Sequence, residues 1–347
     1  MKKLSVLVMA LVLFGWTQAA SAAGDLTIFI WSEYMDPEVI SEFQKKHDIK
    51  VRLDYYESNE EMIAKLQSGG LGQYDIIVPS TYAIPSLKNL NLIQPLKKDQ
   101  IPNMANIDPM FTKMEADPGN EYTIPYQWGT SGLAVRHKDA TQINASWNLL
   151  FKPGEELGGF IIFDTARDAL ASSLKYLGYS LNTTDPKQVE EAARLLVATK
   201  KRPTFLGFDG GVGGLNKVMS GIAVTAQVYS GESIRANEED PDVHYVIPAE
   251  GSEIWTDLVA IPQKAPHLEN AHIFLNYVLD AQVGARLATY NRYATPNSAA
   301  KAFIPEADLN NPVMYPSEEA INKMEYIQDL GGANRLYDEA WTMIKTQ

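Results

Sequence analysis

Residues 26–31 read Leu-Thr-Ile-Phe-Ile-Trp, residues 49–56 read Ile-Lys-Val-Arg-Leu-Asp-Tyr-Tyr, and residues 74–79 read Tyr-Asp-Ile-Ile-Val-Pro. Each run is typical of a β-strand, and a proline ends the third. A helical pattern over 38–47 separates the first two runs, and the segment Ser58-Asn59-Glu60-Glu61 opens a capped amphipathic helix before the third. This alternation of strands and helices predicts an α/β fold whose parallel strands are buried on both faces.

The pattern restarts after residue 130. We expect further strands at 132–135, 160–163, 221–228, 243–248 and 255–262, and helices at 146–150, 164–177 and 185–199. A mature chain of roughly 325 residues exceeds what one hydrophobic core usually supports. Because no stretch rich in Pro, Gly and Ser separates the halves, we expect two α/β lobes joined by chain crossings.

The first 22 residues have the pattern of a secretory signal peptide. Met1-Lys2-Lys3 is followed by an apolar run from Leu4 to Trp16, and the segment ends in an Ala-x-Ala pattern at Ala22. The apolar run is shorter than the ~20 residues that span a bilayer. The chain has no cysteine for lipid attachment, so we expect cleavage after Ala22, no membrane insertion of the mature chain, and a location in the periplasm of a Gram-negative bacterium.

Composition excludes several kinds of site and partner. The absence of cysteine excludes disulfides, thiol catalysis and Cys-ligated metals. Among the five histidines only His267 and His272 are near each other in sequence, and a spacing of five does not place both on one helical face, so we expect no metal site. The formal charge of −13 becomes −15 without Lys2 and Lys3, which argues against nucleic acid and favours cations.

A cluster of five glycines between residues 207 and 214 lacks the G-x-G-x-x-G spacing of a dinucleotide site and the lysine of a P-loop. We interpret it as a loop that leads into a helix near 216–219. The chain also lacks the Gly-x-Ser-x-Gly and His-Glu-x-x-His motifs, so we expect a protein that is not an enzyme. A secreted glycosidase stays as an alternative because aromatic and acidic side chains also line sugar sites.

One triplet type occurs twice, as Trp31-Ser32-Glu33 and as Trp255-Thr256-Asp257. On a strand, residues two apart point to the same face, so each triplet would present an indole beside a carboxylate. That pair suits an ammonium group on a methylene chain, because the carboxylate neutralises the charge and the indole covers the alkyl part. The alternative is a core tryptophan beside a solvated acid.

Other polar and aromatic residues follow predicted strands directly. They are Ser80 to Tyr82, Asp164 to Asp168, and Tyr229. Ligands of open α/β sheets bind beyond the carboxyl ends of strands, so these residues and Trp31 are candidates for the lining of a cleft.

These segments belong to a longer ordered series. The series is WSEY at 31–34, YESNE at 56–60, YDIIVPSTY at 74–82, PYQWGT at 125–130, DTARD at 164–168, LGYSLNTTDP at 177–186, WTD at 255–257 and YATPN at 293–297. It resembles the periplasmic spermidine/putrescine-binding proteins of polyamine import systems over essentially the whole mature chain. The resemblance implies a two-lobed periplasmic binding protein fold of type II with the ligand cleft between its lobes. The implied N-terminal lobe is 23–130 plus about 258–300, and the implied C-terminal lobe is about 131–257 plus about 301–347.

The resemblance also implies the residues of the cleft and no catalytic residue, metal or cofactor. The aromatic walls would be Trp31, Tyr34, Tyr82, Tyr229, Trp255 and Tyr293. The ammonium ligands would be Glu33, Asp168 and Asp257, with Ser32, Ser80, Thr165 and Gln328 as hydroxyl and amide neighbours. Arg167 would serve as a structural clamp that orients the carboxylates.

Two positions depart from the family pattern. Spermidine-binding members often have a carboxylate where this chain has Thr165 and a tryptophan where it has Tyr229. Asp168 stays available opposite Asp257, so both ends of a triamine still have partners. We therefore expect spermidine or norspermidine as the ligand in preference to putrescine.

The resemblance leaves two kinds of membrane partner open. The first is the inner-membrane ABC permease of an import system, to which a monomeric receptor delivers its ligand. The second is a transmembrane sensor protein, as in the norspermidine-responsive members of this fold that control a cyclic-di-GMP enzyme and biofilm formation. Either partner would read the closure of the cleft around the polyamine.

Overall fold

The computed structural model describes residues 24–347. The predicted signal peptide, residues 1–22, lies outside this range. None of the helices within residues 24–347 combines the length and the apolar character that crossing a membrane requires.

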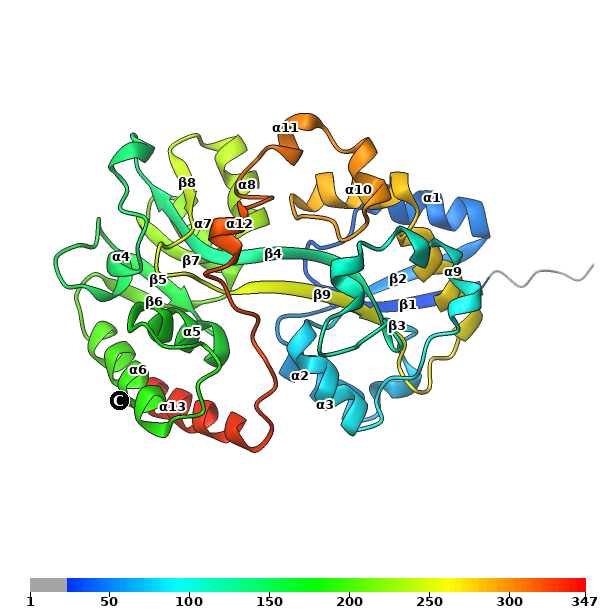
Figure 1. Ribbon diagram of the computed structural model, residues 1–347, viewed down its shortest axis with the longest axis horizontal. Coiled ribbons are helices and arrows are strands. Elements are labelled where there is room, and N and C mark those ends of the chain that lie inside the picture. Colours follow the sequence, from blue (N-terminus) through cyan, green and yellow to red (C-terminus); the bar gives the residue numbers. More distant parts are fainter. Residues whose placement is uncertain (1–23) are drawn as a thin grey trace, which may run out of the picture.

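Two lobes lie side by side along the longest axis of the molecule (Figure 1). The N-terminal lobe, on the right, contains β1 (Gly24–Trp31), α1 (Pro37–His47), β2 (Ile49–Tyr56), α2 (Asn59–Gln67), β3 (Ile76–Ile77), α3 (Ile84–Asn89), α9 (Leu268–Val278) and α10 (Ala281–Asn291). The C-terminal lobe contains α4 (Asn148–Phe151), β5 (Phe160–Phe163), α5 (Ala166–Tyr176), α6 (Pro186–Thr199), β6 (Phe205–Asp209), α7 (Gly211–Met219), β7 (Thr225–Tyr229), α8 (Ser230–Glu239), β8 (Val243–Val246) and α13 (Asn334–Thr346). The short helix α11 (Glu306–Leu309) lies above the junction of the lobes in this view, and α12 (Glu318–Ile321) is seen lower, toward the C-terminal lobe.

Two long strands, β4 (Thr123–Arg136) and β9 (Ile254–Ala260), run through the junction. The strand order is β2-β1-β3-β9-β4-β7-β5-β6, and β8 pairs with β4 outside this path. β1 is parallel to β2 and β3, whereas β4 and β9 are antiparallel to each other. The first half of β4 pairs with β9 and its second half, from Ser131, pairs with β7 and β8. The sheet is therefore a mixed α/β sheet in which β4 belongs to both lobes.

The local sequence explains where the helices begin. The Asp36 side chain accepts from the Glu38 N–H at the start of α1, which has Pro37 in its first turn. At the start of α2, Ser58 accepts from the Glu61 N–H while the Glu61 carboxylate accepts from the Glu57 N–H, and the predicted cap is confirmed.

Two sequence-based expectations were wrong. α7 begins at Gly211, so most of the glycine cluster is helical and not a loop. The reason is close packing: a Cβ at Gly213 would lie 2.3 Å from Asp209 Oδ1, and one at Gly211 would lie 3.0 Å from the Tyr229 ring. The segment 125–130, which we placed before a strand, is part of β4, because it pairs with β9.

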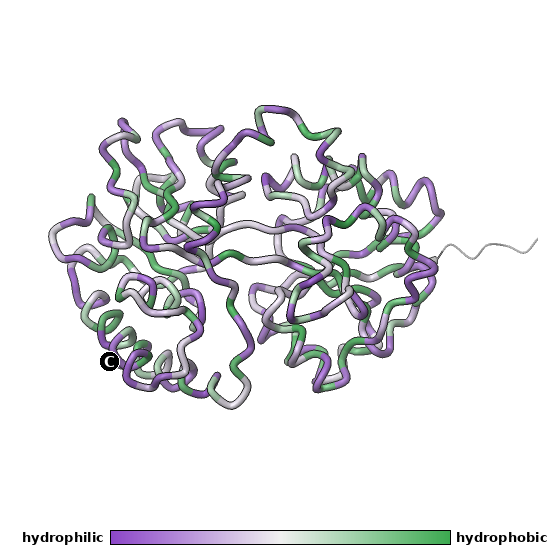
Figure 2. Tube along the Cα trace, in the orientation of Figure 1, coloured by the Kyte–Doolittle hydropathy of each residue, from purple (hydrophilic) through white to green (hydrophobic). Residues whose placement is uncertain are grey.

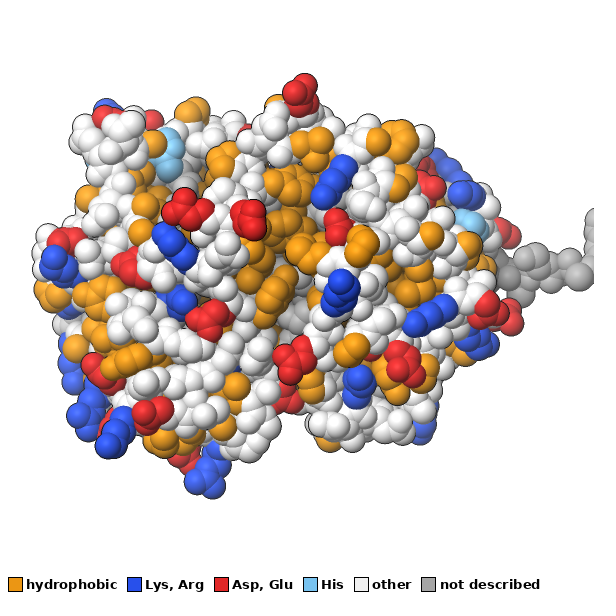
Figure 3. All heavy atoms as spheres, viewed as in Figure 1, with side chains coloured by type: hydrophobic (Ala, Val, Ile, Leu, Met, Phe, Trp, Pro, Cys, Tyr) orange, Lys and Arg blue, Asp and Glu red, His pale blue; other side chains and the backbone are white. Residues whose placement is uncertain are grey.

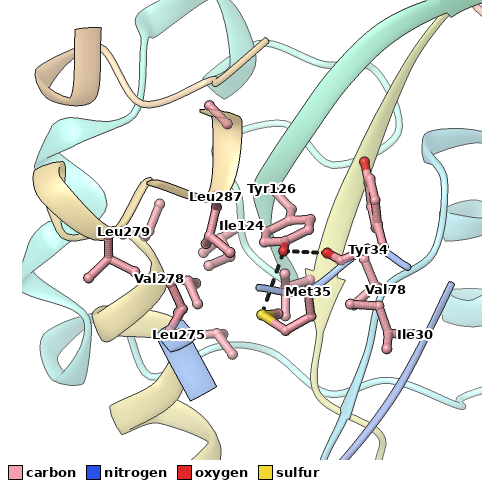
Figure 4. Close-up of a cluster of buried hydrophobic side chains, with 14 of the residues drawn as sticks. Ile30, Tyr34, Met35, Val78, Ile124, Tyr126, Leu275, Val278, Leu279 and Leu287 are labelled. Atoms are coloured by element: carbon pink, nitrogen blue, oxygen red, sulfur yellow. Dashed lines mark hydrogen bonds between the residues drawn. The ribbon is translucent and has the colours of Figure 1, made fainter. Parts of the chain in front are cut away.

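Each lobe has a hydrophobic core of its own. Figure 2 shows hydrophobic residues concentrated on the inner strands and helices of both lobes, with hydrophilic residues along the outer loops. In the N-terminal lobe, residues of β1, β4, α9 and α10 meet below the junction (Figure 4). There the Tyr126 hydroxyl donates to the Tyr34 carbonyl oxygen at 2.8 Å, and the buried Tyr34 ring packs edge-on against the Tyr126 ring with centroids 5.3 Å apart. The core thus holds both the backbone and the ring of a candidate cleft residue.

The crossing of β4 and β9 leaves no space for a side chain at position 129. A Cβ there would lie 2.6 Å from Trp255 Cζ2 and 2.9 Å from Ser230 Oγ. We expect Gly129→Ala to displace Trp255 and to lower the free energy of unfolding by about 1–3 kcal/mol in urea denaturation. Gly72→Ala is the matched control, because no atom lies within 4 Å of a Cβ built at position 72. Equal losses for the two variants would contradict this account of the crossing.

Candidate ligand-binding cleft

The ends of several strands converge on the junction of the lobes. Trp31 ends β1, Ser80 follows β3, Tyr229 ends β7, and α5 begins just after β5 with Asp168 in its first turn. Figure 3 shows hydrophobic side chains gathered in a band over the middle of β4 and β9, with a furrow between the lobes below it. This is the position at which α/β sheets bind ligands.

Asp257 lies on β9 at the junction and is only 6% exposed. Its Oδ1 accepts a hydrogen bond of 2.6 Å from Ser80 Oγ. Burial raises the pKa of Asp257 to about 7, the hydroxyls of Ser80 and Tyr34 oppose this rise, and the Glu232 carboxylate adds to it. No lysine or arginine forms an ion pair with Asp257 among the described residues, so its negative charge is uncompensated.

Four aromatic rings surround this carboxylate. The ring centroid of Trp255 lies 4.8 Å from that of Tyr293 and 5.9 Å from that of Tyr229, and Tyr34 lies 5.7 Å from Tyr293, all nearly perpendicular. Trp255 Nε1 and the Tyr34 hydroxyl are buried, and neither makes a hydrogen bond of ordinary geometry within residues 24–347. Buried polar atoms normally have partners, so these two atoms are available to a ligand.

A second acidic group lies where α5 begins. Thr165 Oγ1 donates to Asp168 Oδ2 at 2.5 Å, and the Tyr229 hydroxyl donates to Asp168 Oδ1 at 3.4 Å. Tyr82 approaches from the N-terminal lobe, and its hydroxyl donates to Glu60 Oε1 at 3.4 Å. Thr165 and Tyr229, the two positions of departure from the family pattern, therefore both contact Asp168.

Sequence reasoning missed two carboxylates of the junction. Glu232, in the first turn of α8, accepts a hydrogen bond of 2.5 Å from the Tyr293 hydroxyl, and burial raises its pKa. Glu253 is 6% exposed and accepts from Ser131 Oγ at 2.7 Å. Residue 253 is two positions before Trp255, so the alternation of a strand was the signal that could have found Glu253. Glu232 had no comparable signal, because only the packing of α8 brings it here.

The first triplet differs from its prediction. Trp31 donates from Nε1 to the Val78 carbonyl oxygen at 2.8 Å and packs on Tyr56 with centroids 4.5 Å apart. Glu33 does not share its face, because the chain leaves the strand and Glu33 has a φ of 55°. The same-face expectation was wrong for this triplet, although Glu33 is close enough to raise the pKa of Glu232 together with the larger effect of burial.

The remaining predicted residues have other partners. Ser32 Oγ donates to Glu57 Oε1 at 2.7 Å. The Gln328 side chain is exposed, and only the backbone of this residue is engaged: its N–H donates to Asn182 and its carbonyl oxygen accepts from Arg167. The structure thus does not bring these two side chains against the carboxylates.

From the sequence we expected Arg167 to orient the cleft carboxylates. It forms no hydrogen bond with them within residues 24–347. Its guanidinium donates to the Gln328 carbonyl oxygen at 2.9 Å and to Asn182 Oδ1 at 3.0 Å, and it lies 4.5 Å above the Tyr337 ring. Arg167 therefore holds the C-terminal segment against the C-terminal lobe, and it leaves the acidic groups of the cleft without a direct cationic partner.

The arrangement has a clear chemical preference. Carboxyl groups that form no ion pair within residues 24–347 lie in two sets, Asp257 with Glu232 and Asp168 with Glu253, and aromatic rings flank them. Carboxylates bind ammonium groups, and aromatic faces attract cations and cover alkyl chains. Within residues 24–347 no three His, Cys, Asp or Glu side chains are grouped as metal ligands. The geometry favours an elongated organic cation.

Comparisons with known proteins point to one group. The family model of the bacterial extracellular solute-binding proteins matches residues 38–314. The chain is 35% identical over 331 residues to the spermidine/putrescine-binding periplasmic protein of Escherichia coli, with 94% of each chain covered. It is 33% identical over 366 residues to a putrescine-binding periplasmic protein of Pseudomonas aeruginosa, covering 100% of this chain and 99% of that protein.

Solved structures agree with the sequence relatives. The substrate-binding protein of a spermidine/putrescine ABC transporter from Streptococcus pneumoniae has a TM-score of 0.79 at 31% identity and covers 93% of this chain and 98% of its own. A Treponema pallidum lipoprotein has a TM-score of 0.81 at 26% identity, with 92% and 99% covered. The predicted two-lobed binding-protein fold is confirmed.

The shifted pKa of Asp257 predicts how stability depends on pH. Its pKa is about 7 in the folded chain and 3.8 in the absence of the fold, so the protonated form favours folding. Protonation of Asp257 contributes on the order of 4 kcal/mol to the free energy of unfolding. This stabilisation is fully present below pH about 4 and is lost as the pH rises through 7. We expect the melting temperature of the ligand-free protein to fall between pH 5 and 8, and to fall less in Asp257→Asn.

Asp99→Asn is the control, because Asp99 is exposed. A slope of melting temperature against pH that is the same in Asp257→Asn as in the wild type would contradict the burial of an ionisable Asp257.

Proposed function

Since the chain belongs to the spermidine/putrescine-binding periplasmic proteins that serve ABC importers, we propose that it captures a linear triamine, spermidine or norspermidine, in preference to putrescine. In this proposal Asp257 and Asp168 bind ammonium groups at the two ends of the cleft. The protein is a binding protein and not an enzyme. The observation that carries the proposal is the pair of uncompensated acidic sets on either side of aromatic rings.

The contacts of Asp257 support its role as a principal ammonium ligand. Ser80 of the N-terminal lobe donates a hydrogen bond to one carboxylate oxygen of Asp257. Trp255 is two positions before Asp257 on β9, and the Tyr34 hydroxyl faces the Asp257 carboxylate. An ammonium group would meet a carboxylate whose desolvation the fold has already imposed, so ionising Asp257 and binding the cation support each other.

The energies are adequate for tight binding only if both kinds of contact operate. A charge-assisted hydrogen bond contributes about 1.5–3 kcal/mol and a cation–π contact about 0.5–2 kcal/mol. Desolvating each ammonium group costs several kcal/mol. A micromolar to nanomolar dissociation constant requires roughly −8 to −12 kcal/mol. Carboxylates at both ends and aromatic cover between them are therefore required together.

Contacts between the lobes support delivery of the ligand to a membrane protein. Tyr82 of the N-terminal lobe packs against Ala171, Leu181 and Ile327, and Ser86 Oγ donates to Asp329 Oδ2 at 3.5 Å. A ligand that bridges the lobes would stabilise this closed arrangement and its outer surface. We propose that an inner-membrane ABC permease recognises that surface of a monomeric receptor.

Calorimetry with a matched ligand series tests the ligand. We expect spermidine and norspermidine to bind at least about tenfold more tightly than putrescine, because a third ammonium group adds a charge-assisted contact. A neutral oligosaccharide should give no heat. Putrescine binding as tightly as spermidine would contradict the triamine preference, and binding of the sugar alone would contradict the polyamine site.

Substitution of Asp257 tests the assignment within the cleft. Asp257→Ala would leave an ammonium group unpaired, which costs about 3–5 kcal/mol, so we expect the dissociation constant for spermidine to rise by about 100-fold or more. Asp99→Ala should leave affinity unchanged. A change below about threefold in Asp257→Ala would refute the assignment.

Uptake of labelled spermidine into a strain that lacks the protein tests delivery, and unchanged uptake would exclude an import role.

A further inference from the structure

Glu253 lies directly before β9, two positions ahead of Trp255 and four ahead of Asp257. Trp255 and Asp257 alternate on β9 and therefore face the same side of the strand. The antiparallel register places Gly129 opposite Trp255 and Gln127 opposite Asp257, and Ser131 of β4 contacts Glu253 through both backbone and side chain. The chain thus has one carboxylate on either side of Trp255 in the sequence.

Glu253 lies against Asp168 and not against a cation. Its Oε2 accepts from Ser131 Oγ at 2.7 Å, and Glu253, Asp168, Ser131 and Gln227 line one narrow recess together with core residues. Gln227 Nε2 donates to the Asp168 carbonyl oxygen, so the amide fixes the backbone of Asp168 and does not neutralise its side chain. The buried carboxyl group of Glu253 therefore lies beside the half-buried Asp168.

The other charged and titratable groups around this pair are few. Arg167 is next to Asp168 on α5, but it donates its hydrogen bonds to Gln328, Asn182 and Asn334 and forms none with Glu253 or Asp168 within residues 24–347.

Tyr229 of β7 and Tyr82 of the N-terminal lobe face the pair with their hydroxyls, and Glu60 of α2 approaches Asp168. Burial and the Asp168 carboxylate raise the pKa of Glu253 well above its ordinary value, while Ser131 and Arg167 lower it. Ionising the buried Glu253 beside a second carboxyl group is costly in the absence of a cation.

We propose that Glu253 is a ligand-binding residue of this cleft: its buried carboxyl group holds a proton in the ligand-free protein, and it releases that proton to solvent when an ammonium group binds between Glu253 and Asp168. The inference rests on the proposed function of the cleft. Before binding, Glu253 is neutral. After binding, Glu253 is ionised, and the cation compensates its charge. No bond other than that to the proton is broken.

This assignment determines how affinity depends on pH. At low pH Glu253 holds its proton and presents no charge to the ligand. As the pH rises, the proton is lost more easily and the charge of Glu253 strengthens binding. Glu253 thus contributes to affinity at high pH and contributes little at low pH. A residue with only a structural role would affect affinity equally at every pH.

The test compares Glu253→Gln with wild type in calorimetric titrations of spermidine from pH 5 to 8. We expect the dissociation constant of Glu253→Gln to be about tenfold higher than that of wild type at pH 8 and within about threefold of it at pH 5. Titrations in buffers of different ionisation enthalpy should show about one proton fewer released by the variant. Glu239→Gln, the same change at an exposed position of α8, is the control and should match wild type.

Two further measurements keep the inference testable if Glu253→Gln folds poorly. Ser131→Ala removes the hydrogen-bond donor that favours ionised Glu253. The affinity of this variant for spermidine should therefore be lowered at pH 7 and recover toward that of wild type at pH 8. The pH dependence of the melting temperature without ligand should be weaker in Glu253→Gln than in Glu239→Gln. A uniform loss of affinity across pH, or equal proton release by Glu253→Gln and wild type, would overturn the role of Glu253. Absence of any polyamine binding by wild type would overturn the proposed function instead. The ligand-free melting curves report on the proton of Glu253 separately.

Discussion

The pairing of β4 with β9 is the constraint on which the rest of this structure depends. Both strands run through the junction, so their register sets the relation of the lobes and the positions of the cleft residues together. Gly129 allows the Trp255 ring to approach β4 closely, and the alternation of β9 places Asp257 on the same side as that ring. A rigid pair of strands is a suitable base for a site because it fixes side chains more closely than loops do.

Electrostatics determines which ligands this pair of strands can bind. The fold buries carboxyl groups at the junction and directs its nearby guanidinium, Arg167, to backbone and amide oxygens. The raised pKa of Asp257 and the buried position of Glu253 show that ionised carboxylates are costly there in the absence of a cation. A ligand that brings positive charge removes this cost, so the stability of the protein and its affinity for cations are linked through the same groups.

Closure connects the site to a partner. The cleft is built from both lobes: Ser80 and Tyr82 come from the N-terminal lobe, and Asp168 and Tyr229 come from the C-terminal lobe. A long cation that contacts both sets favours the arrangement in which Tyr82 packs against Ile327. Occupancy of the cleft therefore changes the relation of the two outer surfaces, which is the property that a receptor for a membrane transporter requires.

Local sequence was sufficient to predict the α/β elements, the caps of α1 and α2, and the set of segments that resembles the polyamine-binding family. It was also sufficient to select Trp255 and Asp257, because a strand has a fixed alternation. It did not predict the turn at Glu33, the helical glycines of α7, or the presence of Glu232, since these depend on contacts between segments far apart in the chain. The sequence by itself determined the fold class and the chemical types of the site residues. Only the tertiary structure decided which carboxyl groups lie together in the cleft and that Arg167 forms no ion pair with them, because charge compensation depends on distances in space and not on order along the chain.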